Sequence, residues 1–355
     1  MALAGMGTPR RRDGACEGPS TSGGDRYAWV PYPGGHRKRD GFIANYETAC
    51  VERERFFSRT NWTAAVAEAL ASEALGPEDR AMTLRYDQSE HPLLDAFCDL
   101  VGERHLATVH NRWPAHDRAR SHLEEKRALL APLTVPSAKR DAFEETYDRL
   151  VREVVLPAIA KRRRRARAAC HANDDERYPY AAFPRARARQ PSSFRAVGCH
   201  VDSTYGHGPC STNCWLPLAK LDARGRNSLR VESAPGEEDF EPVSADVGEI
   251  RVFDGSARAR RAVANARDET RVSLDFRVVP ESLCAFDASR DGSEKAARYR
   301  VGEYFSAAAA DASGAFRRVV LGAPRGKRGF PRSDNARGRG GGRDGATRRG
   351  LAMHR

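Results

Sequence analysis

The sequence has no long apolar run and very little lysine. No stretch approaches the roughly 20 consecutive apolar residues that a membrane-spanning helix needs, and residues 1–7 lack the apolar core of a secretory signal. Only 7 of the 60 basic residues are lysine, so arginine carries most of the net charge of +12. Residues 324–355 hold ten basic and two acidic residues, a charge of +8, which leaves +4 for the rest of the chain. The body of the protein is therefore nearly balanced, which disfavours nucleic acid as its main partner.

The eight cysteines show no paired spacing. Without a secretory signal, this pattern indicates a reducing compartment, and we expect a cytoplasmic protein with organellar import as the alternative. Five possible zinc ligands do lie close together in sequence, namely Cys199, His200, His207, Cys210 and Cys214. Their spacing matches no standard zinc module, and Cys199 would point away from His200 on a strand, so the pattern disfavours a zinc site in this stretch.

Composition divides the chain into three parts. Residues 1–40 are rich in Gly, Pro, Ser and Arg and predict a disordered arm, and residues 323–355 predict a disordered Arg/Gly-rich tail with weak affinity for polyanions. Residues 41–322 are long enough for a single domain, which we expect to be mainly helical over 41–175 and to form a β-structured core over 176–310.

Helical periodicity marks three segments of the first half. Asn61 is a candidate helix cap, residues 92–100 predict a short helix, and Ser137 begins the longest one. Pro157 is expected to kink that last helix before a basic run at 161–165, which we interpret as a solvated helix end.

The second half predicts short strands separated by turns. Residues 271–278 alternate strictly between apolar and polar side chains. The apolar side consists of Val272, Leu274, Phe276 and Val278. The polar side consists of Arg271, Ser273, Asp275 and Arg277. Residues 194–202 are also predicted to be extended, which would project His200 and Asp202 from one face, a spacing that suits two ligands of one metal ion. Further strands are expected at 213–218, 228–233, 249–254 and 299–305, and together they predict a sandwich or barrel with a polar interior, such as a liganded jelly roll.

The order of several blocks in this region resembles a known family. These blocks are the His-x-Asp of residues 200–202, Asn-Cys-Trp-Leu-Pro-Leu at 213–218, Asn-Ser-Leu-Arg-Val-Glu-Ser at 227–233, Gly-Glu-Ile-Arg-Val-Phe-Asp-Gly at 248–255, Asn265, and Thr-Arg-Val-Ser-Leu-Asp-Phe-Arg at 270–277. Their order resembles the non-haem Fe(II)/2-oxoglutarate-dependent oxygenases, in particular the phytanoyl-CoA dioxygenase-like and streptomycin-biosynthesis-type branch. The resemblance implies a double-stranded β-helix (a cupin-like jelly roll) preceded by a helical region, and a dioxygenase that uses dioxygen to hydroxylate a small molecule.

The resemblance also implies roles for individual residues. His200 and Asp202 would be two of the three ligands of Fe(II). Arg271, aided by Ser273, would hold the far carboxylate of the co-substrate 2-oxoglutarate through paired charge-assisted hydrogen bonds. A structural ion pair is the competing interpretation of Arg271. Asn213 and Trp215 share a strand face and would border the same site, although a lone Trp is more often a core residue.

One position departs from the family pattern. The second metal-binding His is expected eleven residues before Arg271, and this sequence has Arg260 there, with no His anywhere from Gly208 to Met353. An arginine stays protonated, and at about 4 Å from a divalent cation the repulsion would be on the order of several kcal/mol. Three hypotheses follow: a non-catalytic binding protein with a degenerate oxygenase fold, an atypical metal site completed by His207 or a carboxylate, or a local sequence error.

Overall fold

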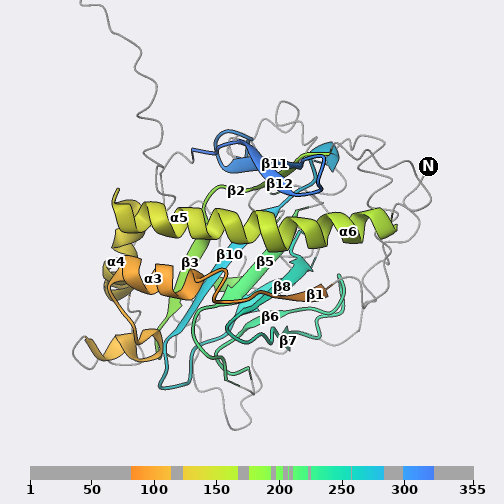
Figure 1. The fold of residues 1–355 in the computed structure, drawn as a ribbon. Helices are drawn as coiled ribbons and strands as arrows, with labels where there is room; N and C mark the ends of the chain where they lie inside the picture. The colour runs from red at the N-terminus through yellow and green to blue at the C-terminus, as the bar shows by residue number, and fades with distance from the viewer. Residues whose placement is uncertain are drawn as a thin grey trace, which may run out of the picture.

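Two antiparallel sheets face each other, and helices cover the outer face of the larger one (Figure 1). A computed structural model of the chain describes residues 81–112, 123–166, 176–192, 197–202, 207, 211–222, 225–256, 258–283 and 299–323. The predicted arm at 1–40, the helix after Asn61 and the tail beyond residue 323 lie outside these residues. The arrangement of the sheets and helices is that of a double-stranded β-helix with an N-terminal helical layer, as the sequence predicted.

The larger sheet has eight strands, in the order β1-β8-β5-β10-β2-β11-β12, with β3 also paired to β10. They are β1 (Ala81–Arg85), β2 (Tyr178–Ala181), β3 (Arg185–Arg189), β5 (Thr212–Pro217), β8 (Glu249–Asp254), β10 (Arg271–Val278), β11 (Phe305–Ala310) and β12 (Phe316–Val320). The smaller sheet has the order β4-β9-β6-β7. Its strands are β4 (Val197–His200), β6 (Leu229–Val231), β7 (Glu241–Pro242) and β9 (Arg260–Ala262).

The helical layer is dominated by one long helix that crosses the larger sheet (Figure 1). It begins with α5 (Ala138–Leu150), passes through a π-helical turn, η4 (Val151–Val155), and ends with α6 (Leu156–Ala166). The Ser137 hydroxyl caps its first turn by accepting a hydrogen bond from the Arg140 amide at 3.2 Å. The helix runs on through Pro157 without ending, a π-helical turn lies just before it, and the kink expected at Pro157 stays a prediction. The other helices are α3 (Leu93–Val101), α4 (Leu123–Leu130), and the short turns η2 (Leu106–Arg112), η3 (Ala131–Thr134) and η6 (Glu281–Leu283).

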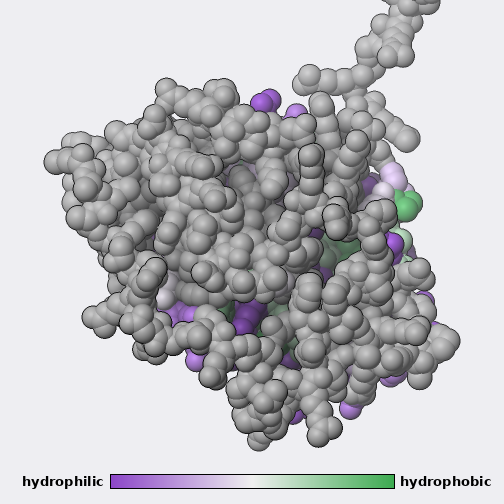
Figure 2. Space-filling view, turned by 180° about the vertical axis from the view of Figure 1, so that it is seen from behind, coloured by the Kyte–Doolittle hydropathy of each residue, from purple (hydrophilic) through white to green (hydrophobic). Residues whose placement is uncertain are grey.

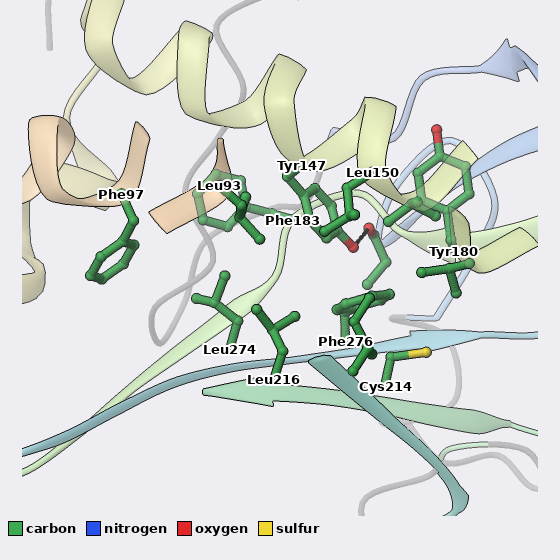
Figure 3. Packing of buried hydrophobic residues seen from close by; sticks show 14 of the residues in the cluster. Leu93, Phe97, Tyr147, Leu150, Tyr180, Phe183, Cys214, Leu216, Leu274 and Phe276 are labelled. Atoms are coloured by element: carbon green, nitrogen blue, oxygen red, sulfur yellow. Dashed lines mark hydrogen bonds between the residues drawn. The ribbon is translucent and has the colours of Figure 1, made fainter. Parts of the chain in front are cut away.

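The main core lies between this layer and the larger sheet (Figure 3). Tyr147 and Leu150 of α5 point toward the larger sheet, and the rings of Tyr147 and Phe276 of β10 meet edge to face with their centroids 5.2 Å apart. All four apolar residues of β10 are at most 1% exposed and belong to this core. The alternation predicted for residues 271–278 is confirmed, and the polar residues of β10 consequently face the smaller sheet.

Two strand predictions need correction. The extended segment at 194–202 is shorter than expected, because β4 ends at His200 and Asp202 lies in the turn that follows; residues 193–196 lie outside the described part of the chain. Residues 299–305 form a turn that leads into β11, in which the Phe305 amide donates to the Arg300 carbonyl at 3.0 Å. Strands β1, β2, β3, β7, β9, β11 and β12 were not predicted.

The other predicted strands and the helix at 92–100 correspond to elements of the structure. On the face opposite to that of Figure 1, described residues reach the surface at separate places, many of them hydrophilic (Figure 2). No helix among the described residues is long and apolar enough to cross a bilayer.

Candidate functional site

The space between the sheets is lined by arginine. Strand β3 alternates Arg with Ala, so Ala186 and Ala188 face the helical core while its arginines share the opposite face. In the pairing of β3 with β10, Arg189 lies opposite Arg271, Arg187 opposite Ser273, and Arg185 opposite Asp275. The smaller sheet adds His200 and Arg260, which are direct partners in the pairing of β4 with β9.

Asp202 lies at the centre of this region and is completely buried. Its Oδ1 accepts hydrogen bonds from Arg260 and from Nη2 of Arg277, the latter at 3.0 Å, and its Oδ2 accepts from Nε of Arg277, also at 3.0 Å. Burial alone would raise the pKa of this carboxyl group, but the guanidinium groups of Arg260 and Arg277 outweigh burial and hold the pKa well below its usual range. Asp202 is thus an ionised carboxylate held between two cations, one from each sheet.

His200 is 7% exposed, and its Nδ1 lies 2.9 Å from the Gly198 carbonyl oxygen. Because a carbonyl can only accept, Nδ1 carries the proton in this contact. Burial, followed by the nearby charge of Arg260, lowers the pKa of His200 to about 4. The imidazole is therefore neutral at physiological pH, which is the form that binds metal ions.

Iron does not fit the site as the described residues arrange it. Within those residues, no group of three or more His, Cys, Asp or Glu side chains is placed to hold a metal ion. Both oxygens of Asp202 are already occupied by guanidinium donors. Arg260 sits directly across from His200 and presents a cation where the family resemblance requires a third ligand.

His207 does not complete a metal site with His200 and Asp202. Its ring lies against Tyr299, with centroids 3.9 Å apart, and 5.9 Å from the ring of Tyr304. The alternative zinc cluster is not assembled among the described residues either. Cys214 belongs to the core beneath the helices, Cys199 belongs to a separate small cluster, and Cys210 lies outside the described residues.

Arg271 and Ser273 lie next to each other on the inner face of β10, as the alternation predicted. Arg271 is 4% exposed, and its Nη1 donates to the Asn227 carbonyl at 2.7 Å. Burial, followed by the charge of Arg187, lowers the pKa of Arg271 to about 10, so it remains a cation at pH 7. The structural ion pair considered for Arg271 does not form with any described carboxylate. Instead Nε of Arg271 and the buried Ser273 hydroxyl have no protein partner among the described residues.

Asn213 and Trp215 lie on the neighbouring strand β5 and have different surroundings. Asn213 is 3% exposed and lies opposite Arg277 of β10. Trp215 packs between the sheets in an apolar cluster whose other members are Val231, Val243, Ala245 and Phe253. The described surroundings of Trp215 are those of a core residue.

Gly255 has no side chain, and the guanidinium group of Arg260 occupies the space that one would fill. A Cβ at this position would lie 2.3 Å from Nη1 of Arg260 and 2.5 Å from Nδ2 of Asn213. The absence of a side chain at residue 255 therefore lets the guanidinium reach Asp202.

We expect Gly255→Ala to destabilise the protein by about 1–3 kcal/mol, because the new methyl group forces Arg260 away from its buried carboxylate. Urea unfolding measures the change. In the Arg260→Ala background the same glycine substitution should cost clearly less, because the contact with Arg260 is gone and only the contact with Asn213 remains. An equal cost in both backgrounds would contradict this packing.

Several inner-face residues were not singled out from the sequence. Arg277 was recognised only as part of the polar side of its strand, although it is a main partner of Asp202. Arg187 and Arg189 were missed because β3 was not predicted. The Arg-Ala alternation of residues 185–189 was the available signal.

Sequence comparison with curated proteins finds a distant relative of the chain. No family model matches the chain. It is 28% identical over 228 residues to the streptomycin biosynthesis protein StrG of Streptomyces griseus, covering 62% of this chain and 96% of StrG. The chain is a distant relative of StrG.

Solved structures give weaker similarity. The alpha-ketoglutarate-dependent epimerase SnoN from nogalamycin biosynthesis aligns with a TM-score of 0.35 and 16% identity over 74% of this chain and 99% of SnoN. A prolyl-4-hydroxylase from Pseudomonas putida aligns with a TM-score of 0.33 and 12% identity over 62% of this chain and 96% of the hydroxylase. A nickel complex of the non-heme monooxygenase ThoJ aligns with a TM-score of 0.36 and 14% identity over 57% of this chain and 75% of ThoJ. These overlaps are too slight to transfer a function.

Proposed function

We propose that the protein binds a small anionic molecule between the sheets of an oxygenase-like fold and does so without a resident metal ion. The observation that carries this proposal is the Asp202 carboxylate, which is enclosed by Arg260 and Arg277. A buried carboxylate that is already neutralised by two guanidinium groups is a poor ligand for a further cation.

Arg271 and Ser273 support a ligand of negative charge. Arg271 is buried, remains charged, and keeps an unused Nε beside the unused hydroxyl of Ser273. A buried donor without a partner costs free energy, and a guanidinium is suited to two parallel bonds with a carboxylate. The far carboxylate of 2-oxoglutarate is the first ligand to test here, because the family resemblance assigns it to this arginine.

A second candidate function is the iron- and 2-oxoglutarate-dependent hydroxylation of a small molecule. The neutral imidazole of His200 next to the ionised Asp202 favours it, since these would be the two remaining metal ligands. Arg271, Ser273, Asn213 and Trp215 would then border the co-substrate. This function requires Arg260 to leave Asp202, which the geometry of the described residues opposes.

We expect 2-oxoglutarate to bind the wild-type protein in the presence of EDTA and Arg271→Gln to weaken that binding about 10- to 100-fold. The expected loss corresponds to one charge-assisted hydrogen-bonded pair. Isothermal titration calorimetry measures both affinities. The matched control is Arg317→Gln, because Arg317 is an exposed arginine on β12 that pairs with Asp311 on the surface. If Arg271→Gln and Arg317→Gln bind alike, the ligand does not occupy this site.

A further inference from the structure

Arg189 and Arg271 form a buried pair of like charges. They lie directly opposite each other on β3 and β10, with 8% and 4% of their surface exposed. Directly opposed side chains of an antiparallel pair come within a few ångströms of each other, so two like charges there repel. Burial, followed by the charge of Arg271, holds the pKa of Arg189 well below its usual value.

Neither arginine of this pair forms an ion pair with a described carboxylate, although the charge of Asp275 acts on Arg271. Nη2 of Arg189 donates to the Val263 carbonyl at 3.3 Å, and Nη1 of Arg271 donates to the Asn227 carbonyl at 2.7 Å. The nearest acid of the inner face, Asp275, is held by Arg187 at 2.8 Å and lies 3.6 Å from Arg277. Strand β3 and Arg271 together contribute four arginines, Arg185, Arg187, Arg189 and Arg271, and Asp275 is the acid paired with β3, so positive charge exceeds negative charge around the pair.

Unused neutral donors lie beside the pair. The Ser273 hydroxyl is fully buried and has no partner among the described residues, and the same is true of Nδ2 of Asn227, whose residue is 2% exposed. Ser273 is two residues from Arg271 on one strand face, and Asn227 is in contact with Arg271 through its carbonyl. Ser273 belongs to β10 of the larger sheet, and Asn227 belongs to the turn before β6 of the smaller sheet.

From this excess of positive charge we propose that Arg189 and Arg271 recognise a phosphate monoester. The proposal rests on the proposed function, which is the binding of an anion at this site. A carboxylate carries one charge and two oxygens in a plane, and would leave one buried guanidinium uncompensated. A phosphoryl group carries about 1.5–2 negative charges at pH 7 and three terminal oxygens. It brings more negative charge than a carboxylate to this excess of positive charge, and its oxygens offer acceptors to Arg189, Arg271 and Ser273.

The test compares methyl phosphate with acetate as probes of the full-length wild-type protein by isothermal titration calorimetry in EDTA. We expect methyl phosphate to bind at least about 10-fold more tightly than acetate at pH 7.5. We also expect its affinity to fall as the pH drops below about 6, where the phosphoryl group takes up a proton. Equal affinities for the two probes, or no pH dependence for methyl phosphate, would overturn the proposal.

The variant Arg189→Gln separates this proposal from the proposed function. We expect it to lower the affinity for methyl phosphate about 10-fold or more while changing the affinity for 2-oxoglutarate less than about 3-fold. A parallel loss for both probes would show that Arg189 does not select the phosphoryl group, which would overturn this proposal and leave the proposed anion-binding function in place. Failure of the wild type to bind any of the probes would refute the proposed function itself. Should Arg189→Gln fail to fold, the wild-type selectivity decides the question.

Discussion

Arg260→His is expected to convert the site into one that binds divalent metal ions. The substitution removes a cation from beside Asp202 and supplies an imidazole directly opposite His200. Unit charges at 4 Å and an effective dielectric of about 20 interact by about 4 kcal/mol, so apparent affinity for Co(II) should rise at least ~100-fold. The visible absorption of bound Co(II), titrated under anaerobic conditions, measures this gain.

The control is Arg260→Gln, which removes the charge and adds no strong ligand. We expect it to bind Co(II) more weakly than Arg260→His by at least ~10-fold. Equal binding by the two variants would mean that residue 260 does not act as a ligand position. Tight Co(II) binding by the wild type would contradict the metal-free account.

Asp202→Asn is expected to be the most damaging single change in the inner face. It leaves the buried guanidinium groups of Arg260 and Arg277 without their shared counter-charge. Breaking a buried ion pair from one side costs about 3–5 kcal/mol of unfolding free energy. Urea unfolding at pH 7 measures the loss. Asp95→Asn is the matched control, because Asp95 forms an exposed pair with Arg104 at 3.5 Å and its loss should leave the midpoint unchanged.

The same residue predicts how stability depends on acid. The pKa of Asp202 is depressed in the folded protein, so its contribution is present above the pKa of the unfolded chain, near 4, and is lost as the pH falls through the folded value. The wild type should therefore lose stability steadily below pH 4, and Asp202→Asn should lose less over the same range. Burial alone would raise the pKa of Asp275, but the charges of Arg187 and Arg277 hold it at about 2. Asp275 therefore adds a similar acid-dependent loss of stability in both proteins. Identical acid profiles for the two proteins would contradict the ionised state of Asp202.

The parts of the fold with strong periodicity could be predicted from the sequence. Strand β10 was predictable residue by residue, because its apolar side meets a helical layer and its polar side does not. The long helix was predictable from its apolar stripe and the Ser137 cap. Strands β3 and β9 were not, because short arginine-rich segments carry no β-branched or aromatic signal and owe their conformation to pairing with neighbours.

The sequence indicated which residues belong to the candidate site but not which of them contact one another. The sequence placed His200, Asp202, Arg260 and Arg271 as functional candidates, and the structure brings Arg260 across from His200 and into contact with Asp202. The sequence could not show that Arg277 would share that carboxylate. It also could not show that Arg189 would oppose Arg271, because both facts depend on strand register.

Whether ligand binding needs a metal ion can be measured directly. Titrating 2-oxoglutarate into the wild-type protein by calorimetry, once with EDTA and once with anaerobic Fe(II), compares the two states in one experiment. A metal-free anion site predicts binding with the same affinity in both, and no visible charge-transfer band in the iron sample. Binding that appears only with Fe(II), together with that band, would contradict the account and establish the iron-dependent alternative.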